Sequence, residues 1–167
     1  MRVLVTGAAG FIGYSLITRL LARGDEVVGV DIVNDYYDVS LKEARLARLV
    51  EQGGSRFSFC RTDFADYATL TAALAEKPFE RIVHLGAQAG VRYSIENPHA
   101  YVQANLVGHL NLLEVARHRG AEHMVYASSS SVYGGNTKLP FSVDDRVDHP
   151  MSLYAATKKA DELMSET

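Results

Sequence analysis

Short apolar runs alternate along the chain with longer segments in which apolar residues recur three or four positions apart. The short runs are rich in β-branched residues and are apolar without interruption at their centres, a pattern typical of strands that are covered on both faces of a parallel sheet. They predict strands at residues 3–6, 26–30, 57–60, 81–85 and 123–128.

The longer segments have the period of helices that pack one face against such a sheet. They predict helices at residues 11–23, 41–51, 67–76, 101–119 and 153–167. Gly24, Gly53, Pro78 and Gly120 lie near the ends of the first four, where glycine and proline commonly stop helices. Ser152 is placed to cap the last helix. The alternation predicts an α/β fold of the Rossmann type, a doubly wound parallel sheet with helices on both faces.

Composition and charge narrow the class of protein. The chain has 167 residues, 47% hydrophobic and 22% charged, which fits one globular domain over 1–167. Its net charge is -3 and it has no basic run, so we expect neither nucleic acid nor a membrane surface as a partner. Cys60 is the only cysteine and lies in an apolar run that suggests a buried strand, which excludes an intrachain disulfide and fits a reducing compartment. We therefore expect a cytoplasmic protein, since no apolar span approaches about 18 residues.

Three glycines follow the first predicted strand and open the first predicted helix. Gly7, Gly10 and Gly13 lie where glycine permits a tight turn and lets the backbone approach a pyrophosphate at the positive end of a helix. A turn of this kind can also join a strand to a helix and bind nothing, so the position of the motif gives it its weight. The motif predicts a dinucleotide-binding turn.

Two acidic residues follow predicted strands at the same edge of the sheet. Asp31 comes directly after the second strand, at the distance where an acid accepts hydrogen bonds from ribose hydroxyls. A carboxylate there repels a 2′-phosphate, and residues 32–35 contain no arginine, which favours NAD over NADP. Asp63 follows the third strand and can accept from the adenine amine. Each also has a plain alternative, Asp31 as the start of a turn and Asp63 as a helix N-cap.

Tyr154 and Lys158 lie four residues apart, hence on one face of the last predicted helix. A phenol has an ordinary pKa near 10, and a nearby ammonium favours its ionised form, so we expect Lys158 to activate Tyr154 as a base. Such pairs are common on helix surfaces and mean little alone. The serine run 128–131 at the end of the fifth strand adds hydroxyls that can donate to a sugar oxygen; a polar strand end or turn is the alternative for that run.

Together these features resemble the extended short-chain dehydrogenase/reductases, specifically the NAD-dependent sugar-nucleotide epimerase/dehydratase family, along essentially the whole chain. Two stretches, residues 33–38 followed by Leu41 and Lys42, and residues 88–94, are most similar to UDP-glucuronate 4-epimerases. Gly86 departs from the usual alanine of the family, which affects only local packing.

The resemblance implies a set of site residues without a metal. For NAD they are Gly7, Gly10, Phe11, Ile12, Gly13, Asp31, Asn34, Asp63, Phe64, Leu85, Gly86, Ala87, Gln88, Asn105, Tyr154 and Lys158. The catalytic trio falls on Ser129, Tyr154 and Lys158, with Ser131 as the nearest rival of Ser129. For the UDP-sugar substrate they are Arg92, Ser129, Ser130 and Ser131.

The reaction implied by the resemblance is epimerisation at C4 of UDP-glucuronate, giving UDP-galacturonate. Tyr154 takes the proton of the 4-hydroxyl while hydride passes to NAD, and the resulting 4-ketone turns over and takes hydride back on its other face. Ser130 and Ser131 stand where sibling dehydratases usually carry an Asp-Glu pair, which disfavours loss of water. A sugar-nucleotide reductase and a module that binds NAD without turnover remain open alternatives.

Family members continue past the Tyr-Lys helix into a further strand and a smaller substrate domain. The resemblance therefore implies that this chain is the N-terminal part of a longer enzyme, and that it lacks the smaller domain. It also implies a homodimer, because the predicted helices 101–119 and 153–167 resemble the pair through which family members associate.

Overall fold

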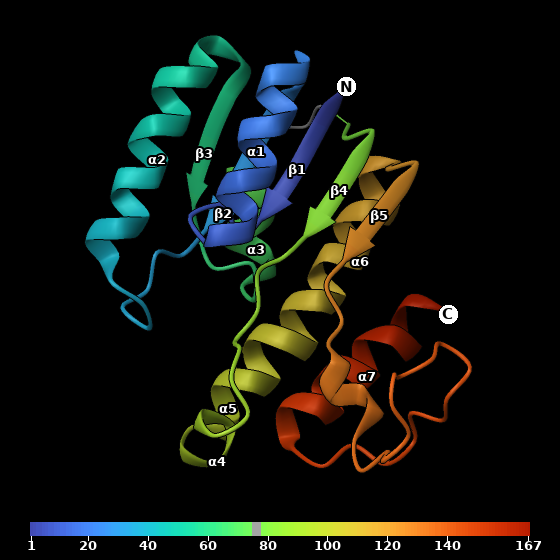
Figure 1. Cartoon of the computed structure of the whole chain (residues 1–167). Helices are drawn as coiled ribbons and strands as arrows, with labels where there is room; N and C mark the ends of the chain where they lie inside the picture. The colour runs from blue at the N-terminus through green and yellow to red at the C-terminus, as the bar shows by residue number, and fades with distance from the viewer. Residues whose placement is uncertain (75–77) are drawn as a thin grey trace. The chain divides into compact units, whose positions relative to one another are not determined.

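The computed structural model describes residues 1–74 and 78–167. Its five strands form one sheet in which every described pair is parallel, in the order β3-β2-β1-β4-β5. The strands are β1 (Arg2–Thr6), β2 (Glu26–Asp31), β3 (Phe57–Arg61), β4 (Arg81–His84) and β5 (His123–Tyr126) (Figure 1). This arrangement confirms the predicted Rossmann-type sheet.

The helices follow the predicted segments with one division and one addition, α4, which was not predicted. They are α1 (Phe11–Arg23), α2 (Val39–Gly53), α3 (Tyr67–Ala73), α4 (Tyr93–Glu96), α5 (Pro98–Tyr101), α6 (Gly108–Arg119) and α7 (Leu153–Ser165). Two 3₁₀ turns, η1 (Gly54–Arg56) and η3 (Ser130–Tyr133), and a π-helical segment, η2 (Val102–Val107), complete the set. The predicted helix 101–119 is divided at η2, and the predicted end of another at Glu76 lies outside the described residues.

The chain forms two compact units. The first unit comprises residues 1–86 and 111–126 and contains the sheet, α1, α2, α3 and most of α6. The second unit comprises residues 87–110 and 127–167 and contains α4, α5, η2, η3 and α7. A single NAD-binding domain over 1–167 stays a prediction.

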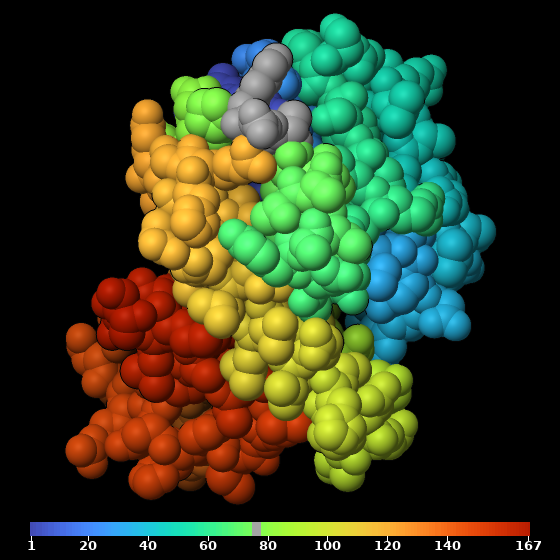
Figure 2. All heavy atoms as spheres, turned by 180° about the vertical axis from the view of Figure 1, so that it is seen from behind, coloured from blue at the N-terminus to red at the C-terminus, as the bar shows by residue number. Residues whose placement is uncertain are grey.

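The apolar residues of the sheet divide between its two faces. Leu4 belongs to a buried cluster with residues of α3 and α6, whereas its neighbours Val3 and Val5 belong to a cluster with residues of α1. Figure 2 shows the first of these faces, where α3 (green) and the C-terminal part of α6 (gold) lie side by side. Because successive side chains of a strand point to opposite faces, the central strands need apolar residues at every position.

The two outer strands correct the expectation that all five are covered on both faces. In β3 Ser58 is exposed and Cys60 is only partly buried, and in β5 His123 is exposed and Val125 is 48% exposed. Each of these strands has one strand neighbour in the described sheet, so it receives less cover than the central strands. Cys60 is therefore a residue of an outer strand and not of a fully buried one.

The carboxyl ends of three strands meet at one edge of the sheet. In the register, Thr6 at the end of β1 pairs with Val30 of β2 and with His84 of β4. The order of the strands reverses direction between β1 and β4, and parallel sheets bind ligands at the carboxyl edge beside such a switch point. The glycine turn that follows Thr6 lies at this edge.

Candidate active site

The glycine turn of the first unit is packed so tightly that side chains cannot be added. Gly7 has a φ of 69°, in the left-handed region that favours glycine, and its carbonyl oxygen accepts from the amide of Gly10 at 3.0 Å. A Cβ on Gly13 would lie 2.1 Å from the same oxygen. The turn therefore needs glycine at both positions.

The helix that follows the turn presents its amino end without a side-chain cap. Gly10 is the N-cap of α1 and contributes no side-chain hydrogen bond, and the first turn of the helix contains no acidic residue. The side chains of Phe11 and Ile12 are 72% and 63% exposed. The first amides of α1 are thus suited to donate hydrogen bonds to an anionic group, as amides at helix amino ends commonly do.

Asp31, at the end of β2, braces the turn. One of its carboxylate oxygens accepts from the amide of Ala9 at 3.0 Å, and the other accepts from the amide of Val33 at 2.8 Å. Each oxygen can accept a further hydrogen bond, so a role toward ribose hydroxyls is compatible with these contacts. Through its contact with the amide of Val33, Asp31 also starts a turn, which was the alternative role considered for it.

Two buried polar residues under the turn were missed by the sequence reasoning. The Thr6 hydroxyl accepts from the amides of Leu85 and Gly86, at 3.2 and 3.0 Å, and forms a hydrogen bond of 2.6 Å with Nδ1 of His84. Both Thr6 and His84 are buried. The available signal was a threonine directly before the glycine motif, at the end of an otherwise apolar strand.

Asp63 is not the N-cap of the next helix, which corrects the alternative considered for it. Its carboxylate accepts from the amide of Ala65 at 2.8 Å, whereas α3 is capped by Asp66, which accepts from the amide of Thr69 at 3.1 Å. The helix begins three residues later than that alternative requires because Asp63 closes a short turn of its own. A role of Asp63 toward adenine stays a prediction.

Phe64 explains the glycine at position 86. Its ring is buried in the core beside α3 and α6, and a Cβ on Gly86 would lie 2.6 Å from one of its ring carbons. The departure of Gly86 from the alanine of the family thus has a packing reason. Phe64 contributes to the core of the first unit, and its contact with adenine stays a prediction.

In the second unit, one amide joins the segment after β4 to helix α7. The Asn105 side chain accepts from the amide of Gln88 at 2.8 Å, donates to the carbonyl of Gln88 at 3.1 Å, and donates to the hydroxyl of Thr157 at 3.0 Å. Asn105, in η2, is 1% exposed. The structure therefore brings the predicted residues Gln88 and Asn105 together, and it adds Thr157, which lies between Tyr154 and Lys158 and was not predicted.

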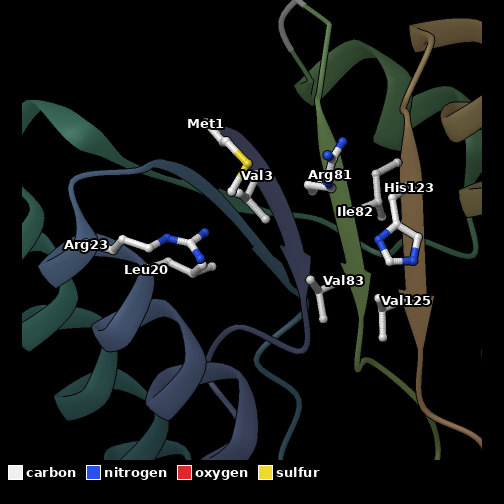
Figure 3. Close-up of a pocket in the computed structure, with 9 residues that line it drawn as sticks. All are labelled: Met1, Val3, Leu20, Arg23, Arg81, Ile82, Val83, His123 and Val125. Carbon is white, nitrogen blue, oxygen red and sulfur yellow. The ribbon is translucent and has the colours of Figure 1, made fainter.

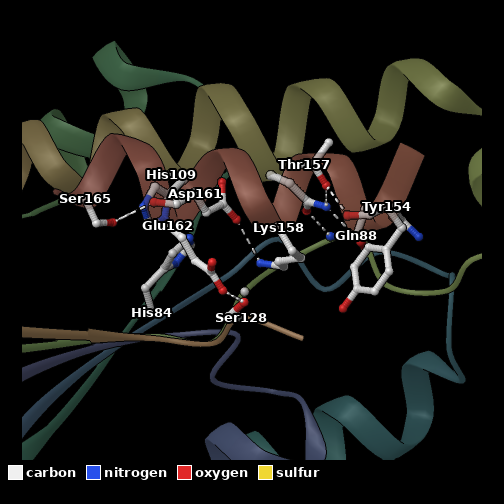
Figure 4. A network of polar contacts seen from close by, with 12 residues as sticks. His84, Gln88, His109, Ser128, Tyr154, Thr157, Lys158, Asp161, Glu162 and Ser165 are labelled. Atoms are coloured by element: carbon white, nitrogen blue, oxygen red, sulfur yellow. Dashed lines mark hydrogen bonds and ion pairs between the residues drawn. The ribbon is translucent and has the colours of Figure 1, made fainter. Parts of the chain in front are cut away.

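Tyr154 and Lys158 extend from the same side of α7 (Figure 4). The ring of Tyr154 packs edge-on against Tyr101 with centroids 6.1 Å apart, and the tyrosine is partly exposed. Lys158 is 3% exposed, and its ammonium forms an ion pair of 3.1 Å with the carboxylate of Asp161. The predicted base is accessible and the predicted cation is buried, an arrangement suited to proton transfer at the phenol.

The surroundings of Lys158 contain two titratable groups with shifted pKa values. Burial raises the pKa of Asp161 to about 6, against the opposing attraction of the Lys158 ammonium. Burial also lowers the pKa of His109 to about 4, and the same ammonium adds to this effect. The Oδ1 atom of Asp161 has no hydrogen-bond partner within the described residues. A buried and incompletely paired carboxylate is costly, and groups with strongly shifted pKa values cluster at functional sites.

The serine run follows β5 and leads into η3, which packs against α7. The Ser129 hydroxyl accepts from the amide of Ser131 at 3.1 Å and thereby caps η3. Ser128 is directed elsewhere, since its hydroxyl donates to Glu162 at 2.6 Å. Ser129 and Ser131 are both partly exposed and remain the two candidates for the catalytic hydroxyl.

The remaining predicted residues lie at exposed positions. Arg92, at the start of α4, and Ser130 are exposed, as are Asn34 and Ala87. Leu85, the residue that follows β4, is partly exposed. Their roles toward cofactor or substrate stay predictions.

A cavity of about 210 Å³ lies within the first unit (Figure 3). It is lined by Met1, Val3, Leu20, Arg23, Arg81, Ile82, Val83, His123 and Val125. Several of these residues begin β1, β4 and β5, at the opposite end of the strands from the glycine turn. The cavity therefore does not coincide with the predicted nucleotide site.

Comparison with known families gives a match over nearly the whole chain. Residues 4–167 match the family described as GDP-mannose 4,6 dehydratase. A probable UDP-glucuronate 4-epimerase of Rhizobium meliloti is 52% identical over 167 residues, which are 100% of this chain and 48% of that protein. UDP-glucuronate 4-epimerase 3 of Arabidopsis thaliana is 53% identical over 166 residues, which are 99% of this chain and 38% of that protein.

A solved structure agrees with the same assignment of fold. The UDP-glucuronic acid 4-epimerase of Bacillus cereus, in complex with UDP-glucuronic acid and NAD, aligns with a TM-score of 0.85 and 34% identity, covering 99% of this chain and 51% of that one. This chain spans about half the length of the curated relatives that it matches first. No helix in the described part of the chain is both long and apolar enough to cross a bilayer.

Proposed function

This chain belongs to the GDP-mannose 4,6 dehydratase family of short-chain epimerases and dehydratases, and on that premise we propose that it is the NAD-binding part of a UDP-sugar 4-epimerase. The substrate that we propose is UDP-glucuronate and the product UDP-galacturonate. The observation that carries the proposal is that an accessible phenol, Tyr154, and a buried ammonium, Lys158, extend from the same side of α7 (Figure 4). An activated phenol serves proton transfer, which the binding of NAD alone does not require.

The residues of the first unit fit the nucleotide. The glycine turn leaves no Cβ between the backbone and a pyrophosphate, and α1 opens with its amides uncapped by a side chain. The carboxylate of Asp31 supplies acceptors for ribose hydroxyls and repels a 2′-phosphate, which favours NAD over NADP. NAD, when bound, supplies the acceptor and the donor of one hydride.

The residues of the second unit perform the proton chemistry in this proposal. Tyr154 removes the proton of the sugar 4-hydroxyl and returns it after the 4-ketone has turned over. Lys158 stabilises the phenolate by its charge, and Ser129, or Ser131, donates to the oxygen at C4 as the charge on it changes. Epimerisation returns the cofactor to its oxidised form, so no second redox substrate is needed.

A dehydratase is the second candidate, because the matching family is described by a dehydratase. Elimination of water at C5 and C6 needs its own acid and base. Ser130 and Ser131 stand where the dehydratases that this sequence resembles carry an Asp-Glu pair, and hydroxyls are poor substitutes for carboxyl groups in that step. We therefore rank the epimerase above the dehydratase.

The test is to incubate the full-length protein with UDP-glucuronate and NAD and to separate the products by chromatography. Formation of UDP-galacturonate without net growth of absorbance at the reduced nicotinamide band supports the epimerase. Stoichiometric accumulation of NADH would show net oxidation of the sugar and identify a dehydrogenase instead. In a parallel incubation with GDP-mannose, a 4-keto-6-deoxy product would identify a dehydratase. The 167-residue chain, assayed in parallel, is expected to bind NAD and to form no product.

A further inference from the structure

Helix α2 touches the segment that follows β2 through a buried lysine. The Lys42 ammonium donates to the main-chain oxygen of Asn34 at 2.7 Å and to its side-chain oxygen at 2.8 Å. Lys42 is 7% exposed, which is unusual for a lysine on a helix. Burial of an ammonium costs free energy unless it is hydrogen-bonded, so these two contacts hold both partners in place.

The same face of α2 reaches the glycine turn. Arg45, three residues after Lys42, donates to the carbonyl of Ala9 at 3.2 Å. Leu46, four residues after Lys42, is buried in a cluster with Ala9 and Val33. Residues at these spacings share one face of a helix. One face of α2 thus contacts both the segment after β2 and the glycine turn, the two segments of the first unit that are predicted to bind the nucleotide.

The segment held by Lys42 contains a strained residue. Val33 has a φ of 55°, a conformation that is unfavourable for a β-branched side chain. The backbone keeps this conformation because the amide of Val33 donates to Asp31 at 2.8 Å and its side chain is buried. Strain of this kind persists only where the surroundings enforce it.

The contact also settles the orientation of an amide. An ammonium can only donate, so the Asn34 side chain must turn its oxygen toward Lys42. Its amide nitrogen has no hydrogen-bond partner within the described residues and remains available as a donor. Asp31, in the same segment, offers carboxylate oxygens as acceptors. A vicinal diol, which both donates and accepts, is complementary to such a pair.

We propose that Lys42 is a positioning residue for the nucleotide, which fixes the Asn34 amide as a donor beside the acceptors of Asp31 and thereby selects the ribose of the adenosine half. Lys42 acts through Asn34 and does not touch the reacting atoms. This inference rests on the proposed function insofar as NAD is the ligand.

The test compares Lys42→Met with Arg48→Met in the full-length protein freed of nucleotide. Methionine keeps the length of the lysine and removes its donors, and Arg48 lies exposed on the same helix. We expect Lys42→Met to raise the Kd for NAD by about tenfold or more in calorimetry. Its affinity for nicotinamide mononucleotide, which lacks the adenosine half, and its kcat at saturating NAD are expected to equal those of Arg48→Met and of the wild type.

A double-mutant cycle with Asn34→Ala separates positioning from general stability. If Lys42 acts through the Asn34 side chain, the two substitutions together weaken NAD binding by less than the sum of their single effects, because only the main-chain contact of Lys42 remains in Asn34→Ala. Additive losses, an unchanged Kd for Lys42→Met, or equal losses for NAD and the mononucleotide would each overturn the inference. Failure of the wild type to bind NAD would instead contradict the proposed function. Circular dichroism and Tm verify that each variant is folded. If Lys42→Met does not fold, the Kd of Asn34→Ala for NAD still tests whether the Asn34 amide contributes to binding.

Discussion

The residues predicted to bind ligands are held in place by opposite means in the two units of the chain. In the first unit the decisive groups are backbone amides and missing side chains, with Gly7, Gly13 and Gly86 packed where a Cβ does not fit. In the second unit the decisive groups are side chains, with both the amide oxygen and the amide nitrogen of Asn105 hydrogen-bonded and Lys158 buried against Asp161. The difference shows that the first unit is sensitive to changes of size, and the second to changes of hydrogen bonding and charge.

The largest effect is expected from Tyr154→Phe in the full-length enzyme. Removal of one hydroxyl eliminates the group that exchanges the proton, so kcat is expected to fall by about 10³-fold, within the range for general acid-base catalysis. The Tm is expected to stay within the error of the wild type. The matched control is Tyr67→Phe on α3, which is expected to keep full turnover. Unchanged turnover of Tyr154→Phe would refute the role of the phenol.

Gly13→Ala tests the claim that the first unit is sensitive to size. The added Cβ would clash with the carbonyl oxygen of Gly7. We therefore expect the free energy of unfolding to fall by about 3 kcal/mol and NAD binding to become undetectable. Gly120→Ala is the control, because its φ of 64° makes alanine unfavourable while no atom lies within 4 Å of the new Cβ. That variant is expected to lose about 1 kcal/mol and to keep NAD binding. Equal losses in both variants would show that size is not what matters at position 13.

His109→Gln tests the claim that the second unit is sensitive to charge. The pKa of His109 in the folded chain, about 4, lies below its ordinary value of 6.5. Between these two pH values the histidine binds a proton in the unfolded chain but not in the folded chain. This group therefore reduces stability as the pH falls from 6.5 through 4. In urea titrations from pH 7 to pH 4, the loss of unfolding free energy is expected to be about 2 kcal/mol smaller in His109→Gln than in the wild type.

The control for this experiment is His123→Gln, which changes an exposed histidine of β5. Its stability is expected to follow the wild-type pH dependence. Parallel curves for His109→Gln and the wild type would show that burial of His109 has no electrostatic cost.

Thr157→Val is expected to have the smallest effect. It tests most specifically whether the second unit depends on hydrogen bonding. The substitution keeps the shape of the side chain and removes the acceptor of the buried Asn105 amide, so kcat is expected to fall about tenfold with little change in KM. Thr157→Ser keeps the hydroxyl and should restore kcat to near the wild-type value. Thr71→Val on α3 serves as the control. A fall in Tm without a fall in kcat would reduce Thr157 to a structural residue.

The first unit was predictable from the sequence because local rules determine it. Continuous apolar runs locate the five strands, and the start of α1 at Phe11 follows from the glycine turn. The cover of β3 and β5 was not predictable, because exposure depends on which strands become outer strands in the sheet. Thr6 and His84 were missed because a single polar residue in an apolar run carries no periodic signal.

The second unit was less predictable because its contacts join segments that are distant in sequence. Tyr154 and Lys158 were found from their spacing and Asn105 from family resemblance, yet the contact of Asn105 with Thr157 spans 52 positions. The π-helical segment that presents Asn105 lies inside an otherwise regular helical pattern. Asp161 has the sequence context of an ordinary surface residue of a helix, and only the structure shows it buried beside Lys158.

The most direct measurement uses UDP-glucuronate that carries deuterium at C4, incubated in ordinary water with the full-length enzyme and NAD. If hydride leaves C4 for the cofactor and returns to the same carbon, the UDP-galacturonate that forms keeps its deuterium at C4, as mass spectrometry and NMR can show. Replacement of that deuterium by hydrogen from the solvent, or the absence of UDP-galacturonate, would contradict the account.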